Sequence, residues 1–210
     1  MAAPAHPPGF NLVERFRARI AHDLGTHLTV IVGYASLLGA DGDAHDEAAS
    51  REIVSAAEHV SAALADLELV LGLASGAIEA RPEPVDLRAV AEAAIRQVRR
   101  RGEQPLDEPG GSRWPTAHAD SKHLVRALRQ VVTAACEHAS AGVRISVAPA
   151  GDADAAALQV TGANLTEIVE TDLRLALART LLELGGGSLE FADDVATIRV
   201  PLAARQATAA

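Results

Sequence analysis

The sequence predicts an α+β protein in which an antiparallel helical hairpin is followed by an α/β sandwich. Hydrophobic residues make up 49% of the chain and aromatic residues only 2%. Because alanine and leucine carry most of this apolar content, close-packed helices are favoured over an aromatic-rich β core. Apolar residues recur at three- and four-residue intervals in the first third of the chain, whereas helical and strand patterns alternate in the second half. The 210 residues suffice for two modest domains or one large one.

The hairpin is predicted from two apolar stripes on either side of a turn at residues 39–43. The first helix spans residues 13–38 and carries the stripe Val13, Phe16, Ile20, Leu24, Ile31, Tyr34 and Leu38. The second carries Ile53, Ala57, Val60, Leu64, Leu67, Leu71, Ala74 and Ile78, whose four-three spacing is typical of a coiled-coil seam. Since each stripe covers the other only in part, we expect two copies to form a homodimeric four-helix bundle.

A proline-containing segment at residues 81–84 is expected to end the second helix. This assigns residues 1–82 to the hairpin, residues 83–204 to the α/β sandwich and residues 205–210 to a tail.

The second domain is expected to layer helices on one mixed sheet. Asp86 and Asp120 can each cap a helix. The inward residues of these helices are Leu87, Val90, Ala94 and Ile95 in the first and Leu124, Leu128, Val131 and Ala135 in the second. Strands are predicted at 143–148 and 157–162, a helix end at 184–187, and a closing hairpin at 188–202.

Charge and cysteine content narrow the function classes. The formal net charge of −9 disfavours nucleic acid and anionic membrane surfaces as partners. A lone cysteine, Cys136, is expected to be a small buried core residue in a reducing compartment. The N-terminus lacks the regions of a signal peptide and no apolar run is long enough to cross a bilayer, so a cytoplasmic location is expected.

A histidine stands on the polar side of the first helix. At about 100° per residue, His22 falls roughly 170° from the apolar stripe, and Thr26 lies within about 40° of His22. Thr29 and Gly33 continue the same face with small side chains. His22 is therefore expected to face solvent, where a second protein can approach it, although most exposed histidines are plain surface residues.

Other histidines have simpler interpretations. His27 falls on the apolar stripe and is expected to be packed or interfacial. His45 lies at the start of the second helix without a following threonine one turn on. His118, Asp120 and His123 straddle a helix start with spacing that fits no common metal-ligand pattern, so surface and capping roles are expected.

The stretch FRARIAHDLGTHLTVIVGYASLL, residues 16–38, resembles the phosphoacceptor box of sensor histidine kinases. That box consists of His, an acidic residue, two variable residues, Thr or Asn, usually Pro, and then Leu. Here the positions are taken by His22, Asp23, Thr26 and Leu28, with His27 where proline is usual. The order of the later segments is also similar to the dimerisation and ATPase domains of a kinase core.

The same resemblance indicates a degenerate ATPase-like domain. Ala134 stands where the family carries a magnesium-binding Asn. The adenine box, Asp-x-Gly-x-Gly, reads TGANL at 161–165, and the Gly-Leu-Gly-Leu box reads DLRL at 172–175, with a loop between them too short to fold over a triphosphate. Phosphates need backbone donors brought close by glycine, and Asp172 adds a negative charge, so ATP binding is expected to be very weak or absent. The glycines at 185–187 are expected to serve as a helix cap and turn.

The combination of an acceptor histidine with missing nucleotide boxes resembles the dimeric histidine phosphotransferases of multistep phosphorelays. The resemblance implies His22 as phosphoacceptor, Asp23 as its acid/base neighbour and Thr26 in a secondary role. It implies response-regulator receiver domains as partners, possibly with a hybrid histidine kinase. No cofactor of its own is expected, and Mg²⁺ would be held by the partner receiver. Two alternatives remain: a non-catalytic pseudokinase scaffold that binds a histidine kinase or response regulator, and an active but divergent kinase.

Overall fold

The computed structural model describes residues 24–35, 38, 43–99, 105–140, 142–151 and 155–203. The chain divides into two compact units, with the division between Ile78 and Glu79. This division lies four residues before the domain boundary predicted between residues 82 and 83. The predicted tail at 205–210 lies outside the described residues.

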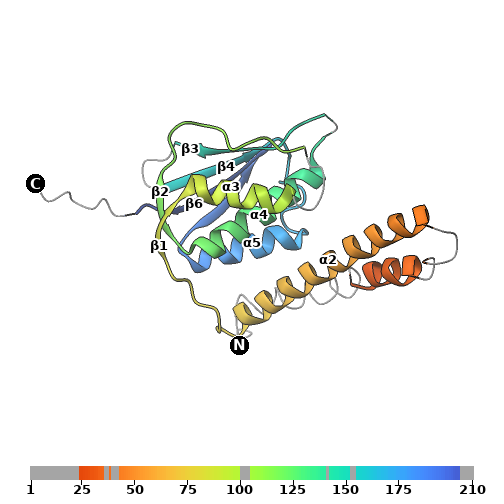
Figure 1. The fold of residues 1–210 in the computed structure, drawn as a ribbon. Coiled ribbons are helices and arrows are strands. Elements are labelled where there is room, and N and C mark those ends of the chain that lie inside the picture. Colours follow the sequence, from red (N-terminus) through yellow and green to blue (C-terminus); the bar gives the residue numbers. More distant parts are fainter. Residues whose placement is uncertain are drawn as a thin grey trace, which may run out of the picture. The chain divides into compact units, whose positions relative to one another are not determined.

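The described residues of the first unit form two helices, one over residues 24–35 and α2 over Asp43–Ala74. Figure 1 shows the short helix, in red, alongside the first part of α2, in orange. Of the first helix predicted at 13–38, residues 24–35 are helical and Leu38 is in a turn, while residues 13–23 lie outside the described residues.

The second helix ends earlier than predicted, at Ala74 rather than at the proline segment 81–84. Gly76 adopts φ +69°, and its N–H bonds Leu73 O at 3.2 Å while Ala77 N–H bonds Gly72 O at 2.9 Å. These two bonds around a left-handed glycine form a Schellman cap, which satisfies the last carbonyls of the helix. Ile78, predicted as the last seam residue, therefore lies beyond the helix, where its side chain packs against Gly72.

The side of α2 that is buried in the single chain differs from the predicted seam. Ala49, Ala56 and Val70 are buried, whereas Leu64 and Leu71 are 45% and 49% exposed. Leu28 and Val32 of the short helix are also exposed, at 50% and 64%. Within the described residues, this unit thus presents a set of exposed apolar side chains, Leu28, Val32, Leu64 and Leu71, which we call the exposed stripe.

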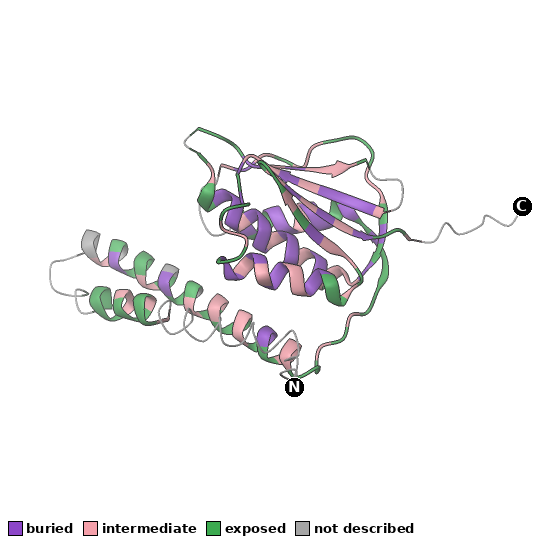
Figure 2. Cartoon of the chain, turned by 180° about the vertical axis from the view of Figure 1, so that it is seen from behind, coloured by how far each residue is buried: buried purple, intermediate pink, exposed green. Residues whose placement is uncertain are grey.

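The second unit layers three helices on an antiparallel sheet (Figures 1 and 2). The helices are α3 (Leu87–Arg99), α4 (Ser121–His138) and α5 (Leu173–Leu184). The strands are β1 (Glu83–Asp86), β2 (Thr116–Ala119), β3 (Ser146–Ala150), β4 (Ala155–Thr161), β5 (Ser188–Ala192) and β6 (Val195–Pro201). Figure 2 shows the buried residues gathered between the sheet and the three helices.

The helix caps and inward faces of this unit follow the sequence. Asp86 accepts a hydrogen bond from Arg88 N at 2.8 Å, and Asp120 accepts from Lys122 N and His123 N, each at 3.0 Å. All eight predicted inward residues are buried. The helix expected to end at 184–187 does end at Leu184, and the predicted closing hairpin is β5–β6.

The prediction of one mixed sheet is wrong. Strands β3, β4, β6 and β5 lie in that order and pair antiparallel, and β1 and β2 form a second antiparallel pair. Outside these strands, Leu106 forms a single parallel bridge with Ile145, and Ala117 forms an antiparallel bridge with Leu202. Consecutive strands β3–β4 and β5–β6 are joined as hairpins, which makes antiparallel pairing the direct outcome. The two four-residue strands β1 and β2 were not predicted, because each lies beside an aspartate that reads locally as a helix cap.

Cys136 is a buried core residue of α4, as predicted. Burial, together with the charge of neighbouring Glu137, raises the pKa of its thiol to about 11.

We expect Cys136 to react with a thiol-specific disulfide reagent at pH 8 about a hundredfold more slowly than in the unfolded chain, because only the thiolate attacks. The release of coloured thiol, followed with and without guanidinium, measures this ratio. Equal rates in the two conditions would show that the thiol is accessible.

No helix in the described part of the chain is both long enough and apolar enough to span a membrane.

Candidate functional site

The predicted phosphoacceptor face is described from residue 24 onward. His22 and Asp23 lie outside the described residues. Thr26 lies on the exposed side of the helix, as does Thr29, whose hydroxyl donates to Gly25 O at 2.8 Å. The face carrying Thr26, Thr29 and Gly33 is therefore open to solvent in the chain, in agreement with the helical-wheel prediction.

His27, at the position where the kinase pattern usually has proline, packs against α2. Its ring stacks on that of His59, with centroids 4.7 Å apart and planes 15° from parallel. The predicted packed role of His27 is confirmed, whereas its partner His59 was not singled out from the sequence.

Core side chains stand at key positions of the first two nucleotide boxes, the magnesium-binding box and the adenine box. Ala134 is fully buried in α4, and Ala163 and Leu165, which stand where the adenine box has its two glycines, are 6% and 2% exposed. Gly162 is required by the fold itself. It has φ +106°, and a Cβ there would lie 2.5 Å from Arg144 O. Gly162, which lies at a variable position of this box, thus allows the backbone at Arg144 to approach closely.

The third box carries an ion-pair network in place of its glycines. Asp172 caps α5 by accepting from Arg174 N at 2.8 Å, and the Arg174 side chain returns two hydrogen bonds, Nε to Oδ1 at 3.1 Å and Nη2 to Oδ2 at 2.6 Å. Arg174 Nη1 also contacts Glu137 Oε1 of α4 at 2.5 Å. We call Asp172, Arg174 and Glu137 the box triad.

The electrostatics of the box triad favour its charged form. Burial acts to raise the pKa of Asp172, but the hydrogen bonds and charge of Arg174 outweigh it and hold the pKa below its usual value. Burial acts to lower the pKa of Arg174, but its bonds to Asp172 and Glu137 raise it overall. The Arg174 guanidinium is thus paired with two carboxylates, through a bidentate contact with Asp172 and a single contact with Glu137.

Sequence reasoning placed Asp172 near the expected phosphate position but missed Arg174 as its partner and Glu137 as the second partner of Arg174. The Asp-x-Arg spacing at a helix start offered a local signal for Arg174. Glu137 lies on a different helix, and its contribution depends on how α4 and α5 pack.

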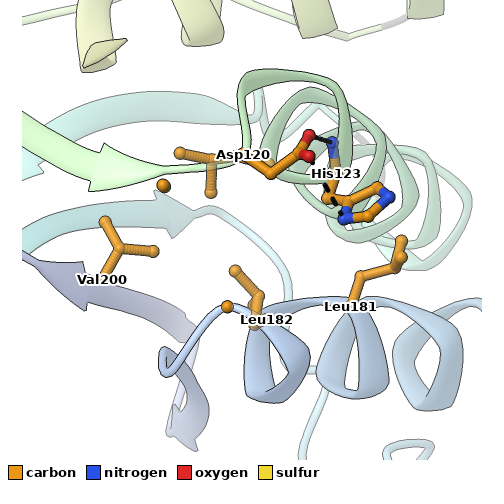
Figure 3. A pocket seen from close by; sticks show the side chains of 8 residues that line it. Asp120, His123, Leu181, Leu182 and Val200 are labelled. Atoms are coloured by element: carbon orange, nitrogen blue, oxygen red, sulfur yellow. Dashed lines mark hydrogen bonds and ion pairs between the residues drawn. The ribbon is translucent and has the colours of Figure 1, made fainter. Parts of the chain in front are cut away.

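A small pocket lies between the start of α4, the end of α5 and β6 (Figure 3). Asp120 and His123 border it on one side, and Leu181, Leu182 and Val200 on the other. Asp120 accepts backbone hydrogen bonds from Lys122, His123 and Arg81, each at 3.0 Å. Burial would raise its pKa, but these bonds and the nearby His123 hold it below the usual value. The predicted capping role of Asp120 is confirmed, and its carboxylate is committed to the backbone.

Neither a family model nor a curated protein matches the sequence. Solved structures do resemble the chain. The Acinetobacter baumannii histidine kinase AdeS superimposes with a TM-score of 0.68 at 18% identity, covering 87% of this chain and 98% of that one. Full-length ShkA in complex with AMPPNP gives 0.55 at 20% identity, covering 89% of this chain and 46% of that one. The cytoplasmic segment of histidine kinase QseC gives 0.51 at 12% identity, covering 66% and 93%. At these identities the likeness concerns the fold, and the chain has the fold of a histidine-kinase core.

Proposed function

We propose that this protein is a histidine phosphotransfer protein of a two-component phosphorelay, which passes a phosphoryl group between receiver-domain aspartates through His22. The observation that supports it best is the pairing of a phosphoacceptor pattern at 22–28 with a nucleotide region filled by protein side chains, on a histidine-kinase-like fold.

The box triad is the reason for proposing that ATP is not a cofactor. Asp172 and Arg174 stand where the resemblance places two glycines, and they bind each other. A triphosphate entering here would meet the buried carboxylate of Asp172 and would have to break its pair with Arg174, leaving a buried charge unpaired. The buried side chains of Ala163 and Leu165 remove the remaining glycine positions.

The proposed chemistry is in-line phosphoryl transfer. A ring nitrogen of neutral His22 attacks the phosphorus of an aspartyl phosphate on a receiver, so a P–N bond forms as the P–O bond to the aspartate carboxylate breaks. Asp23 accepts or orients the other ring N–H and stabilises the positive ring that develops. The partner's Mg²⁺ and lysine balance the phosphoryl charge, and this chain contributes position. The reverse steps deliver the group to a second receiver, with Thr26 in a secondary role.

The exposed stripe supports a homodimer as the working form. Leu28, Val32, Leu64 and Leu71 form an apolar set on the hairpin. A second copy of the same hairpin would cover them in a four-helix bundle, the arrangement that short-looped helical pairs commonly adopt.

The test is phosphate transfer from a panel of pre-phosphorylated receiver domains to the full chain. We expect acid-labile label on the wild type that moves to a second receiver, and no label on His22→Ala. His118→Ala is the matched control, because His118 is an exposed histidine on β2, and it should label normally. If His22→Ala labels like the wild type, the site assignment fails. If receivers bind but keep their phosphate, the chain is a non-catalytic scaffold.

A further inference from the structure

The stacked pair His27 and His59 has a consequence beyond phosphotransfer. The two imidazoles come from different helices of the first unit, and their centroids are 4.7 Å apart. His27 is half-buried and His59 is exposed, so solvent and solutes reach the pair from the His59 side. We propose that His27 and His59 bind a divalent transition-metal ion of the Zn²⁺ class, linking the two helices.

The spacing of the rings suits a shared ion. Two imidazoles bound to one tetrahedral ion through Zn–N bonds of about 2.0–2.1 Å have centroids roughly 5 Å apart. The stacked arrangement turns ring faces toward each other, so a nitrogen of each ring must swing toward the ion. That movement is a rotation about χ2, a broad torsion in histidine, and it requires little change in the distance between the helices.

The small neighbours of His59 on α2 and the charge of this helix are compatible with a bound cation. Ala56 and Ala63, three residues before and four residues after His59, share its face of α2 and have the smallest side chains that carry a Cβ. Helix α2 contains seven acidic residues and one basic residue, so its field favours a cation.

The site offers two protein ligands. Within the described residues, no group of three or more potential metal-ligating side chains exists. Water completes the coordination in a single chain, whereas in the proposed dimer a second pair can contribute. One ion per chain and one ion per two chains are therefore both compatible with the site, and the stoichiometry tells them apart.

The proposed metal ligand His27 is close in sequence to the proposed phosphoacceptor, since it follows His22 by five residues. In this respect the inference extends the proposed function, but it does not depend on it. Its readout is metal binding, so failure of phosphotransfer and failure of metal binding are separate results.

The experiment is calorimetric titration of the untagged, metal-free full chain with ZnCl₂, accompanied by thermal unfolding with and without the ion. We expect saturable binding that raises the midpoint of unfolding. His27→Gln and His59→Gln should each weaken the affinity by about tenfold or more, the scale on which even supporting contacts to a metal ligand act. His118→Gln, which changes an exposed histidine elsewhere, should leave it unchanged.

A spectroscopic measurement covers the case in which a variant loosens the hairpin. With Cu²⁺ as the probe, electron spin echo modulation on the wild type should show coupling to two imidazole nitrogens, and on either single variant to one. Absence of saturable Zn²⁺ binding, or binding that survives both substitutions, would overturn the proposal.

Discussion

Replacing Asp172 by Asn is expected to lower the free energy of unfolding by about 2–3 kcal/mol at pH 7. The substitution keeps a capping oxygen at the start of α5 but removes the charge that Arg174 pairs with at 2.6 and 3.1 Å. Removing one partner of a buried ion pair commonly costs about 3–5 kcal/mol. The effect should be smaller here, because Arg174 keeps its contact with Glu137 and is 20% exposed.

The cost of Asp172→Asn should depend on pH in a defined direction. Because the folded pKa of Asp172 is below its usual value, its ionisation contributes stability at pH values above about 3.9, the pKa of an unfolded aspartate. That contribution is lost as the pH falls through the folded pKa. Urea denaturation over a series of pH values should therefore show the largest difference between wild type and variant at pH 7, and a difference that shrinks as the pH falls below about 3.9.

Asp86→Asn is the matched control for this measurement. Asp86 caps α3 through Arg88 N as Asp172 caps α5 through Arg174 N, but it is exposed. Since asparagine caps about as well as aspartate, this variant should be nearly neutral. If both substitutions cost the same, the box triad contributes nothing beyond the helix cap.

The elements that could be predicted from the sequence are those with local causes. Asp86 and Asp120 signal helix starts because capping is a contact within three residues, and the inward faces of α3 and α4 follow from helical periodicity. The direction of strand pairing depends on which strands become neighbours, which no local pattern records. The mixed-sheet prediction failed for that reason.

The end of α2 shows a different kind of error. The prolines at 82 and 84 are strong helix breakers, but Gly76 had already ended the helix by adopting a left-handed conformation. The apolar seam continues in sequence to Ile78, and periodicity alone does not distinguish a last helical turn from a residue folded back onto it.

In the candidate site, sequence reasoning identified the missing nucleotide boxes but not what replaces them. The absence of glycine at 172 and 174 is visible in the sequence, whereas the closure of Arg174 onto both Asp172 and Glu137 requires α4 and α5 to be adjacent. The same holds for His59, which becomes noteworthy only because a second helix brings His27 to it.

Replacing both Leu64 and Leu71 by Gln is expected to convert the proposed homodimer into a monomer. These side chains are 45% and 49% exposed in the single chain, so their loss leaves the hairpin largely intact while removing apolar surface that a second copy would cover. Each buried leucine contributes about 1.5–3 kcal/mol, and half of that surface is still open here. A two-fold interface contains each position twice, so four changes should weaken the dimer by about 3–6 kcal/mol, or by a factor of roughly 10² to 10⁴ in dissociation constant.

Sedimentation velocity over a range of protein concentrations measures this shift, and circular dichroism at the same concentrations checks that helix content is kept. Leu184→Gln is the control, because Leu184 is 39% exposed at the end of α5 in the second unit and lies outside the exposed stripe. A wild type that remains monomeric at micromolar concentration would remove the dimer from the proposed function. A dimer equally weakened by Leu184→Gln would place the interface on the second unit. If dimerisation is lost only when Leu64 and Leu71 are replaced, the interface lies on the hairpin, where a second copy would cover these exposed apolar side chains.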